Sequence, residues 1–322
     1  MARTSVGILR GGTSGEYALS LKTGAAMLSS LPEDKYDTRD IFIDKSGMWH
    51  LHGIPADPAR VLAQIDVVLN ALHGGVGEDG TVQRILERAG VSYAGSSAHA
   101  SNLSLNKVRA REALRKEGIR IPHGVSFTLD NDMNTYDMAR AVFSQFGPPY
   151  IVKPPSDGAG RGVRFVAMII ELPEQIADVL DEFGSALVEE FIDGEEVTVG
   201  VIEDFRGDEL YVLPPVHIEI PEGHRHIVYD HHEQGILRHI VPSNFSHSEK
   251  QTLSEVARAA HRALELSHFS RADVILTSRG PYLLEVNAYP GLYAGAAFPP
   301  MLESVGSSTR EFLEHTIALA QR

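Results

Sequence analysis

Short apolar runs alternate with amphipathic stretches through the first hundred residues of the chain. An apolar run at 5–11 predicts a strand, and apolar residues at helical spacing from Ala18 to Ala25 predict the helix after it. The same reasoning predicts strands at 36–44, 65–75 and 91–97 and a helix at 80–90. Strands that alternate with helices favour an open parallel sheet, with functional residues at the carboxyl ends of the strands.

The pattern differs after residue 100. A glycine-rich loop sits between two apolar runs that predict paired strands, and residues 221–248 lose periodicity, which predicts an excursion or a mobile loop. The remaining elements expected are helices at 102–118, 172–183, 250–266 and 308–321 and strands at 148–155, 162–168, 185–192, 195–204, 272–278 and 281–290. We therefore expect three consecutive lobes, at 1–100, 101–184 and 185–322.

Composition narrows the function classes. The chain has 322 residues, of which 43% are hydrophobic and 22% charged, as in an ordinary soluble protein. Its formal net charge of −14 argues against non-specific nucleic-acid binding, which needs a basic surface. The absence of cysteine excludes disulfides and thiol nucleophiles. No apolar run is long enough to span a bilayer, and residues 1–12 resemble a first strand more than a signal peptide, so we expect a cytoplasmic protein without membrane partners.

Four polar residues near the C-terminal end carry the strongest chemical signal. Alternation places Arg271 and Asp273 on one face of a strand, and Glu285 and Asn287 on one face of the next strand. The short turn at Arg279-Gly280 allows the two strands to pair. Carboxylate and amide oxygens are the ligands that Mg²⁺ prefers. The alternative is a half-exposed hairpin with solvated polar residues. We favour the metal site because the flanking residues are apolar enough to be buried, and buried carboxylates need cations.

A second signal combines Lys153 with the loop that contains Gly158, Ala159 and Gly160. Lysine charge and backbone N–H groups in such a loop suit nucleotide phosphates. Glu189 and Glu196 flank a turn at a spacing suited to the amine and ribose hydroxyls of adenosine. Each feature alone is a weak signal, since a lysine beside glycines is more often part of a surface hairpin. Together with the downstream metal residues, they indicate a nucleotide site.

Seven stretches together resemble the D-alanine–D-alanine ligases of the ATP-grasp superfamily. They occur in the family's order between residues 11 and 292 and read GGTSGEYALSLKTG, ALHGGVGEDGTVQRILERAGVSYAGSS, LNKVRAREALRKEGI, YIVKPPSDGAG, LVEEFIDGEEVTV, RADVIL and YLLEVNAYPGL. The resemblance implies an α/β (α+β) ATP-grasp fold with an N-terminal open parallel α/β domain. ATP is expected between the central and C-terminal lobes.

The resemblance also implies a role for each matching residue. For ATP, the expected phosphate contacts are Lys107 and Lys153, and the expected adenine and ribose contacts are Glu189 and Glu196, with the backbone near Phe191 and Ile192. The expected ligands of two Mg²⁺ ions, or of Mn²⁺, are Asp273, Glu285 and Asn287. Glu16 is expected to bind the ammonium of the first amino acid, with His73 nearby, and Arg271 to stabilise the tetrahedral intermediate. The family reaction forms an acyl phosphate from ATP and one D-alanine, which the amine of a second D-alanine attacks.

Several positions depart from the family pattern. Ala159 and Gly160 stand where the family's glycine loop carries two serines, and Ala296 replaces the serine expected to bind the second carboxylate. In the lid motif, Gln234 replaces a lysine that contacts the γ-phosphate, and Gly235 replaces a tyrosine. Arg161, Arg164 and Arg238 are the candidate substitutes for that lysine. ATP binding is thus better supported than the identity of the amine acceptor.

Two further features have competing interpretations. Seven of the 15 histidines lie between His217 and His247. A zinc site there lacks helical pairing or cysteine partners, so solvated loop histidines are the preferred interpretation. The motif at Gly77–Gly80 reads as a plain turn by its composition, whereas the resemblance makes it part of a substrate-side loop, which we favour.

Three functions are therefore compared. The main prediction is a D-alanine–D-alanine ligase that uses ATP and Mg²⁺ and acts on small molecules in peptidoglycan precursor synthesis. The first alternative is a diverged ligase with another amine acceptor, and the second is a non-catalytic ATP-binding homologue. Retention of Arg271 argues against the second alternative, since a mere ATP binder has little use for it. A homodimer is expected from the resemblance alone.

Overall fold

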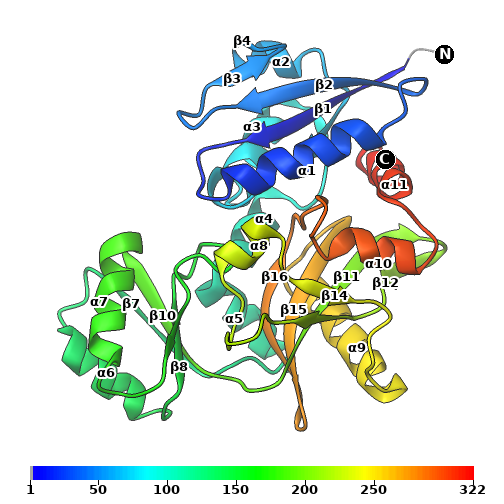
Figure 1. Cartoon of the computed structure of the whole chain (residues 1–322). Coiled ribbons are helices and arrows are strands. Elements are labelled where there is room, and N and C mark those ends of the chain that lie inside the picture. Colours follow the sequence, from blue (N-terminus) through cyan, green and yellow to red (C-terminus); the bar gives the residue numbers. More distant parts are fainter. Residues whose placement is uncertain (1–2) are drawn as a thin grey trace.

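Figure 1 shows the protein as a computed structural model, in which residues 3–322 are described. The N-terminal part forms a six-stranded sheet in the order β4-β3-β2-β1-β5-β6. Its strands are β1 (Thr4–Gly11), β2 (Tyr36–Ile43), β3 (Trp49–Leu51), β4 (Ile54–Pro55), β5 (Val67–Asn70) and β6 (Ser92–Ala94). The predicted parallel pairing is confirmed for β2, β1, β5 and β6. The edge strands β3 and β4 are antiparallel and were not predicted.

Helices cover both faces of this first sheet. Its local helices are α1 (Tyr17–Ser30), α2 (Pro58–Leu62), the short 3₁₀ turn η1 (Gly75–Gly77) and α3 (Thr81–Ala89). Met27 of α1 packs in one core with Val6 and Ile8 of β1, whereas Leu86 of α3 packs in another core with Leu9. Because β1 and β5 run in parallel, the loops after them meet at one edge of the sheet, which faces the rest of the molecule.

The second sheet is antiparallel, has the order β7-β10-β8-β9 and forms the green lobe at the left of Figure 1. Its elements are β7 (Gly124–Thr128), α6 (Thr135–Phe143), β8 (Tyr150–Lys153), β9 (Arg164–Val166), α7 (Leu172–Phe183) and β10 (Ser185–Glu190). The predicted pairing around the glycine-rich loop is confirmed by β8 and β9. This lobe has its own apolar core around Tyr150, Leu172 and Ile176.

The third sheet has the order β14-β13-β11-β15-β16, and β12 pairs with β11. Its strands are β11 (Glu195–Phe205), β12 (Asp208–Val212), β13 (Val216–Glu219), β14 (Arg238–Ile240), β15 (Phe269–Thr277) and β16 (Gly280–Asn287). The associated helices are α4 (Ala98–Leu105), α5 (Lys107–Lys116), α8 (Tyr229–Gln234), α9 (His247–Ala263) and α10 (Phe298–Ser304). The predicted hairpin is confirmed, with Arg271 opposite Asn287 and Asp273 opposite Glu285.

One helix returns across the molecule. After α10, α11 (Thr309–Ala320) lies beside α1 against the first sheet, as the red helix near the top of Figure 1 shows. Phe312, Leu313 and Ile317 join Val6 and Ile8 in a core that continues into the third sheet. The first and third sheets therefore share one core, whereas the second sheet is attached to them by connecting segments.

Two predicted elements need correction. The helix expected at 102–118 is two helices, because the chain breaks at Asn106, whose side chain accepts a hydrogen bond from the N–H of Arg109 and caps α5. The excursion at 221–248 is not all loop, since it contains α8 and β14.

The strands on either side of Asp193-Gly194 belong to different sheets. β10 lies in the second sheet and β11 in the third, so the chain passes from one sheet to the other at residues 191–194. The expected lobe boundary at 184/185 lies just before β10. The division into three lobes remains a proposal. Within residues 3–322, no helix has the length and apolar character needed to cross a membrane.

Candidate active site between the sheets

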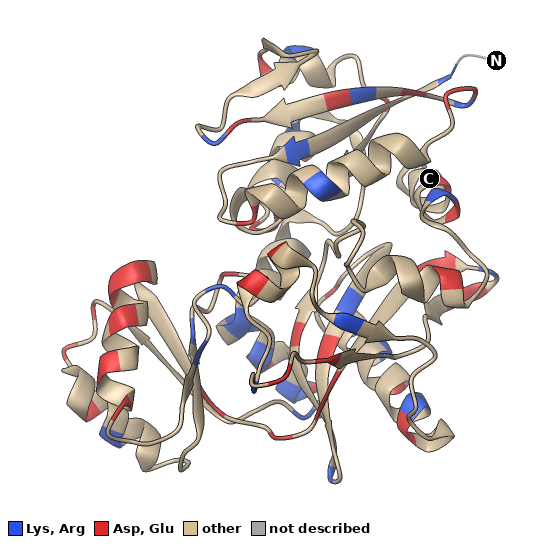
Figure 2. Cartoon of the chain, viewed as in Figure 1, with Lys and Arg blue, Asp and Glu red and all other residues tan. Residues whose placement is uncertain are grey.

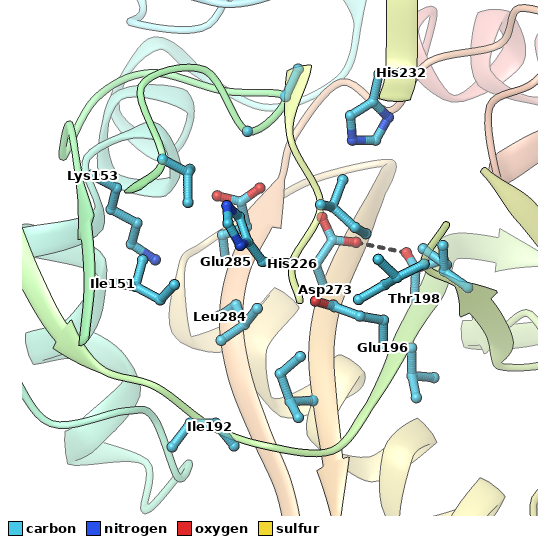
Figure 3. Close-up of a pocket in the computed structure, with 18 of the residues that line it drawn as sticks. Ile151, Lys153, Ile192, Glu196, Thr198, His226, His232, Asp273, Leu284 and Glu285 are labelled. Atoms are coloured by element: carbon cyan, nitrogen blue, oxygen red, sulfur yellow. Dashed lines mark hydrogen bonds between the residues drawn. The ribbon is translucent and has the colours of Figure 1, made fainter. Parts of the chain in front are cut away.

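A cavity lies between the second and third sheets, beneath α8. Residues from both sheets and from α5 and α8 line it, including Lys107, Lys153, Glu196, His232, Arg271 and Glu285. In Figure 3, Lys153 and Ile151 lie on one side, Asp273 and Glu285 rise from the hairpin, and His232 lies above these two carboxylates. Figure 2 shows basic residues along α5 and acidic residues along the outer helix α7. The positive charge of α5 is thus close to the cavity, although the whole chain is acidic.

Asp273 is the centre of a hydrogen-bonded group on the hairpin. Arg271 donates to both of its oxygens, from Nε at 3.0 Å and from Nη2 at 2.7 Å. Asn287 donates to Oδ2 at 2.8 Å, and Thr198 of β11 donates to Oδ1 at 2.7 Å. The structure thus brings Arg271, Asp273 and Asn287 together, and the two-pronged contact holds the Arg271 guanidinium in a defined orientation.

Glu285 connects the hairpin to α5. The Nζ of Lys107 lies 2.9 Å from its Oε2 and also donates to the carbonyl of Asp157 in the glycine loop, at 2.6 Å. Burial alone would raise the pKa of Glu285, but Lys107, Lys153 and Arg271 outweigh burial and lower it to about 2. The carboxylate is therefore ionised at neutral pH.

Lys153 and Glu189 form a buried pair at the edge of the second sheet. Lys153 Nζ lies 2.5 Å from Glu189 Oε2, while Arg111 forms an ion pair with Oε1 of the same carboxylate. Arg111 was not predicted from the sequence. Its signal was helical spacing, because it follows Lys107 by four residues and so lies on the same face of α5.

Glu196 provides a test of whether a cation fits here. Burial, with Asp273 and Glu285 nearby, raises the pKa of Glu196 to about 8. Carboxylates gathered so closely that one of them holds its proton form a site that a divalent cation would stabilise. Residues 3–322 contain no group of three or more His, Asp or Glu side chains arranged for a metal. Asp273, Glu285 and Asn287 offer two carboxylates and one amide, so a cation here needs further oxygens, as phosphates would supply.

The opposite end of the cavity is apolar. Phe191, Ile192 and Ile151 line it along the crossing between the sheets. Phe165 of β9 packs edge-on against Phe191, with ring centroids 5.1 Å apart. Phe191 and Ile192, which are predicted to face the adenine, therefore lie at an apolar end that suits a flat base. Glu196, which is predicted to contact the ribose, lies instead beside Asp273 and Glu285.

Glu16 and His73 follow β1 and β5 at the carboxyl edge of the first sheet. Glu16 is 6% exposed, and its Oε1 has no hydrogen-bond partner within the described residues. Burial, followed by the negative charge of Glu78, raises its pKa. His73 lies 2.7 Å from Thr23 Oγ1 through Nε2 and 3.6 Å from Glu78 Oε1 through Nδ1. The favoured role of Gly77–Gly80 as a substrate-side loop remains a prediction.

The glycine loop lies close to Glu16 and to the segment before α8. A Cβ on Gly158 would lie 2.7 Å from Glu16 Oε1, so a side chain there would collide with the carboxylate. Gly160 has a φ of +73°, and a Cβ there would lie 3.1 Å from the Val228 backbone. Ala159 also has a positive φ, of 51°. Gly160 thus permits a close approach of backbones that a serine would hinder.

We call α8 and the segment before it, residues 221–234, the lid. The Tyr229 hydroxyl donates to the carbonyl of Gly15 at 3.1 Å, and Lys22 Nζ donates to the carbonyl of Glu233 at 2.8 Å. An apolar cluster continues this contact between the lid and the first sheet. Its members are Leu19, Ala159, Tyr229, Tyr293 and Ala296. The lid is therefore held by one hydrogen bond to α1, one to the loop before α1, and an apolar contact.

The candidate substitutes for the lid lysine occupy different places. Gln234 is exposed, as is Arg238, which pairs with Glu219. Arg164 lies 3.7 Å from Glu182 on α7, whereas Arg161 lines the cavity. Of the three arginines, Arg161 alone lies at the cavity wall.

The interpretation of the histidines as solvated loop residues is wrong for part of the segment. His231 is buried at 2% exposure, and His232 and His239 line the cavity. Burial, together with the positive charge of Arg271, lowers the pKa of His232 to about 4. These imidazoles are therefore neutral, and within the described residues none belongs to a metal-binding group.

Comparison with known proteins identifies the family. A model of the D-ala D-ala ligase C-terminus matches residues 113–318, and one of the N-terminus matches residues 52–96. The chain belongs to the D-alanine–D-alanine ligase family. A D-alanine–D-alanine ligase of Desulforudis audaxviator is 32% identical to it, over 98% of each chain.

Solved structures of D-alanine–D-alanine ligases and of a D-Ala:D-Ser ligase have the same fold. The VanG D-Ala:D-Ser ligase of Enterococcus faecalis superposes with a TM-score of 0.86 at 26% identity, covering 99% of this chain and 100% of that one. The Bacillus anthracis D-alanine–D-alanine ligase complexed with ATP gives 0.80 at 26% identity, covering 98% and 97%. These similarities confirm the predicted α/β ATP-grasp fold.

Proposed function

We propose that this protein is an ATP- and Mg²⁺-dependent ligase that joins two D-alanine molecules through an acyl phosphate. The observation that carries the proposal is one cavity in which Lys107 pairs with Glu285 and Arg271 pairs with Asp273. Positive charge for phosphates, oxygens for a cation and a fixed guanidinium thus lie together. The family membership supports the same reaction.

In the first step, Glu16 holds the ammonium of the donor D-alanine. Its buried Oε1 has no hydrogen-bond partner among the described residues, and an arriving ammonium favours the ionised form of this carboxyl. The donor carboxylate attacks the γ-phosphorus of ATP, the bond to the bridging oxygen breaks and ADP leaves. Lys107 and Lys153 offset the negative charge that the two reacting anions bring together.

In the second step, the neutral amine of the acceptor attacks the acyl carbon. The nitrogen loses a proton, inorganic phosphate leaves, and a peptide bond replaces the acyl–phosphate bond. Arg271 stabilises the oxyanion of the tetrahedral intermediate, and its contacts with Asp273 pre-organise it for this role. Asp273, Glu285 and Asn287 would hold two Mg²⁺ ions, or Mn²⁺, which supply positive charge to phosphate oxygens when bound.

The other expected properties are parts of the same proposal. Glu189 and Glu196 bind the adenosine, with the backbone near Phe191 and Ile192 facing the base, and His73 orients the donor side. Small-molecule substrates, a homodimer and a cytoplasmic location rest on the family resemblance. The name of the VanG relative, a D-Ala:D-Ser ligase, makes D-serine the first alternative acceptor to test.

The test uses the purified chain with ATP, Mg²⁺ and D-alanine, and L-alanine serves as the control. We expect phosphate release and D-alanyl-D-alanine, identified by mass spectrometry. Release only with D-serine or another amine would support the diverged ligase instead. ATP binding without phosphate release for any acceptor would contradict both enzyme functions and leave the non-catalytic homologue.

A further inference from the structure

Tyr293 is a buried polar side chain to which the resemblance assigns no role. It follows β16, is 6% exposed and lines the cavity. Within the described residues its hydroxyl has no hydrogen-bond partner, in contrast to Tyr229 and Tyr289, which both donate to backbone carbonyls. Unlike the Tyr150 hydroxyl, which is sealed in the core without a partner, the Tyr293 hydroxyl keeps access to the cavity, so it is free to donate to a molecule bound there.

The ring of Tyr293 is held on several sides. It packs in the apolar cluster with Leu19 and Ala296, and the Ala296 N–H donates to the Tyr293 carbonyl at 3.0 Å. A Cβ on Gly291 would lie 2.7 Å from Tyr293 Cε1, so this glycine makes room for the ring. The ring is therefore a fixed wall of the cavity.

The phenol is a neutral hydrogen-bond donor that lies near Arg271 and Lys22 and also near the carboxyl of Glu16. Burial raises the pKa of Tyr293 to about 12 despite the opposing effect of Arg271, so the hydroxyl keeps its proton and can donate it in a hydrogen bond. Lys22 Nζ lies 5.9 Å from the ring centroid, on the side of α1. Glu16 and Tyr229 also act on the phenol and oppose its ionisation.

Of the three substrates of the proposed reaction, the amine acceptor is the one that fits the cavity wall at Tyr293. Nucleotide binding occupies the cavity from Phe191 to Lys107, and the donor ammonium lies at Glu16. The acceptor must bring its amine to the acyl carbon beside Arg271, and the remaining wall between Arg271 and the lid contains Tyr293 and Ala296. The acceptor's carboxylate therefore faces the phenol.

We propose that Tyr293 determines specificity for the amine acceptor, donating a hydrogen bond to its carboxylate and limiting the size of its side chain. This inference rests on the proposed function. It names the acceptor class as small α-amino acids with a free carboxylate. The phenol takes over binding that the missing hydroxyls at Ala159 and Ala296 cannot provide.

The test compares Tyr293→Phe with Tyr136→Phe, whose tyrosine is 70% exposed on α6. Dipeptide formation is measured against D-alanine concentration, and the KM values of donor and acceptor are fitted separately. We expect Tyr293→Phe to raise the acceptor KM about tenfold or more, the cost of losing a hydrogen bond to a charged group. The donor KM stays within about twofold, and Tyr136→Phe resembles the wild type.

A second variant tests the size limit. Tyr293→Ala removes the ring, and we expect the ratio of kcat/KM for D-norvaline to that for D-alanine as acceptor to rise about tenfold. An unchanged acceptor KM in Tyr293→Phe, or a parallel rise of both KM values, would overturn the inference. If the melting temperature shows that Tyr293→Ala does not fold, the acceptor KM of Tyr293→Phe still tests the inference. A wild type that makes no dipeptide contradicts the proposed function, whereas an active wild type with an indifferent Tyr293→Phe contradicts only this inference.

Discussion

The two ends of the cavity are built on different principles. The end proposed for the phosphates contains three pairs of opposite charge: Lys107 with Glu285, Lys153 with Glu189 and Arg271 with Asp273. At the end proposed for the acceptor, Leu19, Tyr229 and Tyr293 form an apolar cluster that also contains Ala296, where the resemblance implies a serine.

The two ends of the cavity differ in how many substitutions the proposed reaction tolerates. Transfer of a phosphoryl group needs charge at defined places, and one lost partner leaves a buried charge unpaired, so few substitutions are tolerated there. Closure of the lid over an acceptor needs a surface that fits the acceptor and excludes water, and several combinations of side chains can form such a surface. Under the proposed function, the departures from the family pattern at Ala159, Gly160 and Ala296 concern which acceptor is used. Gln234, in place of the lysine expected at the γ-phosphate, is the one departure that concerns the phosphate end.

The largest expected effect breaks the phosphate end. Glu285→Gln removes the charge that pairs with Lys107 and, under the proposed function, a Mg²⁺ ligand. We expect kcat to fall by about a thousandfold or more, since metal charge stabilisation is worth several kcal/mol. Steady-state phosphate release at saturating Mg²⁺ measures this, and Glu195→Gln, an exposed residue on β11, is the matched control. Survival of activity in Glu285→Gln would mean that the metal residues are wrongly assigned.

The second prediction concerns Glu16, between the two ends. Glu16→Gln should raise the donor KM about a hundredfold, the scale of a hydrogen bond between charged groups. Because burial raises the pKa of Glu16, its carboxyl is protonated below that raised value and binds an ammonium poorly. The wild-type donor KM should therefore fall as pH rises through this range.

The pH profile of donor KM distinguishes this role from a structural one. Glu16→Gln should flatten the profile, whereas Glu33→Gln, an exposed residue beyond α1, should leave it unchanged. An unaltered profile in Glu16→Gln would assign the donor's ammonium to another group.

The smallest effect belongs to the lid. Lys22→Met removes the hydrogen bond from α1 to the Glu233 carbonyl and keeps the length of the side chain. We expect kcat/KM to fall about two- to tenfold, in line with the worth of one neutral-acceptor hydrogen bond. Lys116→Met, on the exposed face of α5, is the control. Equal activity of the two variants would show that the apolar cluster alone holds the lid.

Local patterns predicted the hairpin that carries Asp273 and Glu285. Alternation along the two strands placed Asp273 and Glu285 opposite each other because a short turn leaves a hairpin little freedom of register. Asn106 is a typical helix-capping residue, but the continuous apolar periodicity of 102–118 favoured one helix over two. α8 has six residues, too few for periodicity to reveal a helix.

The acceptor end was predictable only in part. The substitutions at Ala159 and Ala296 are visible in the sequence, but Leu19, Tyr229 and Tyr293 come from distant segments. Nothing local indicates that these side chains meet, because their contact depends on how the sheets and the lid pack. The burial of His231 in the segment expected to be solvated has the same origin.

The return of α11 to the first sheet has a consequence for synthesis on the ribosome. β1, β5 and β6 are translated early, whereas α11 follows only after the second and third sheets. Apolar side chains that Phe312, Leu313 and Ile317 will cover thus remain in contact with water during most of translation. The first sheet therefore gains its full packing only when the nascent chain has reached Ala320, although its own strands are complete long before.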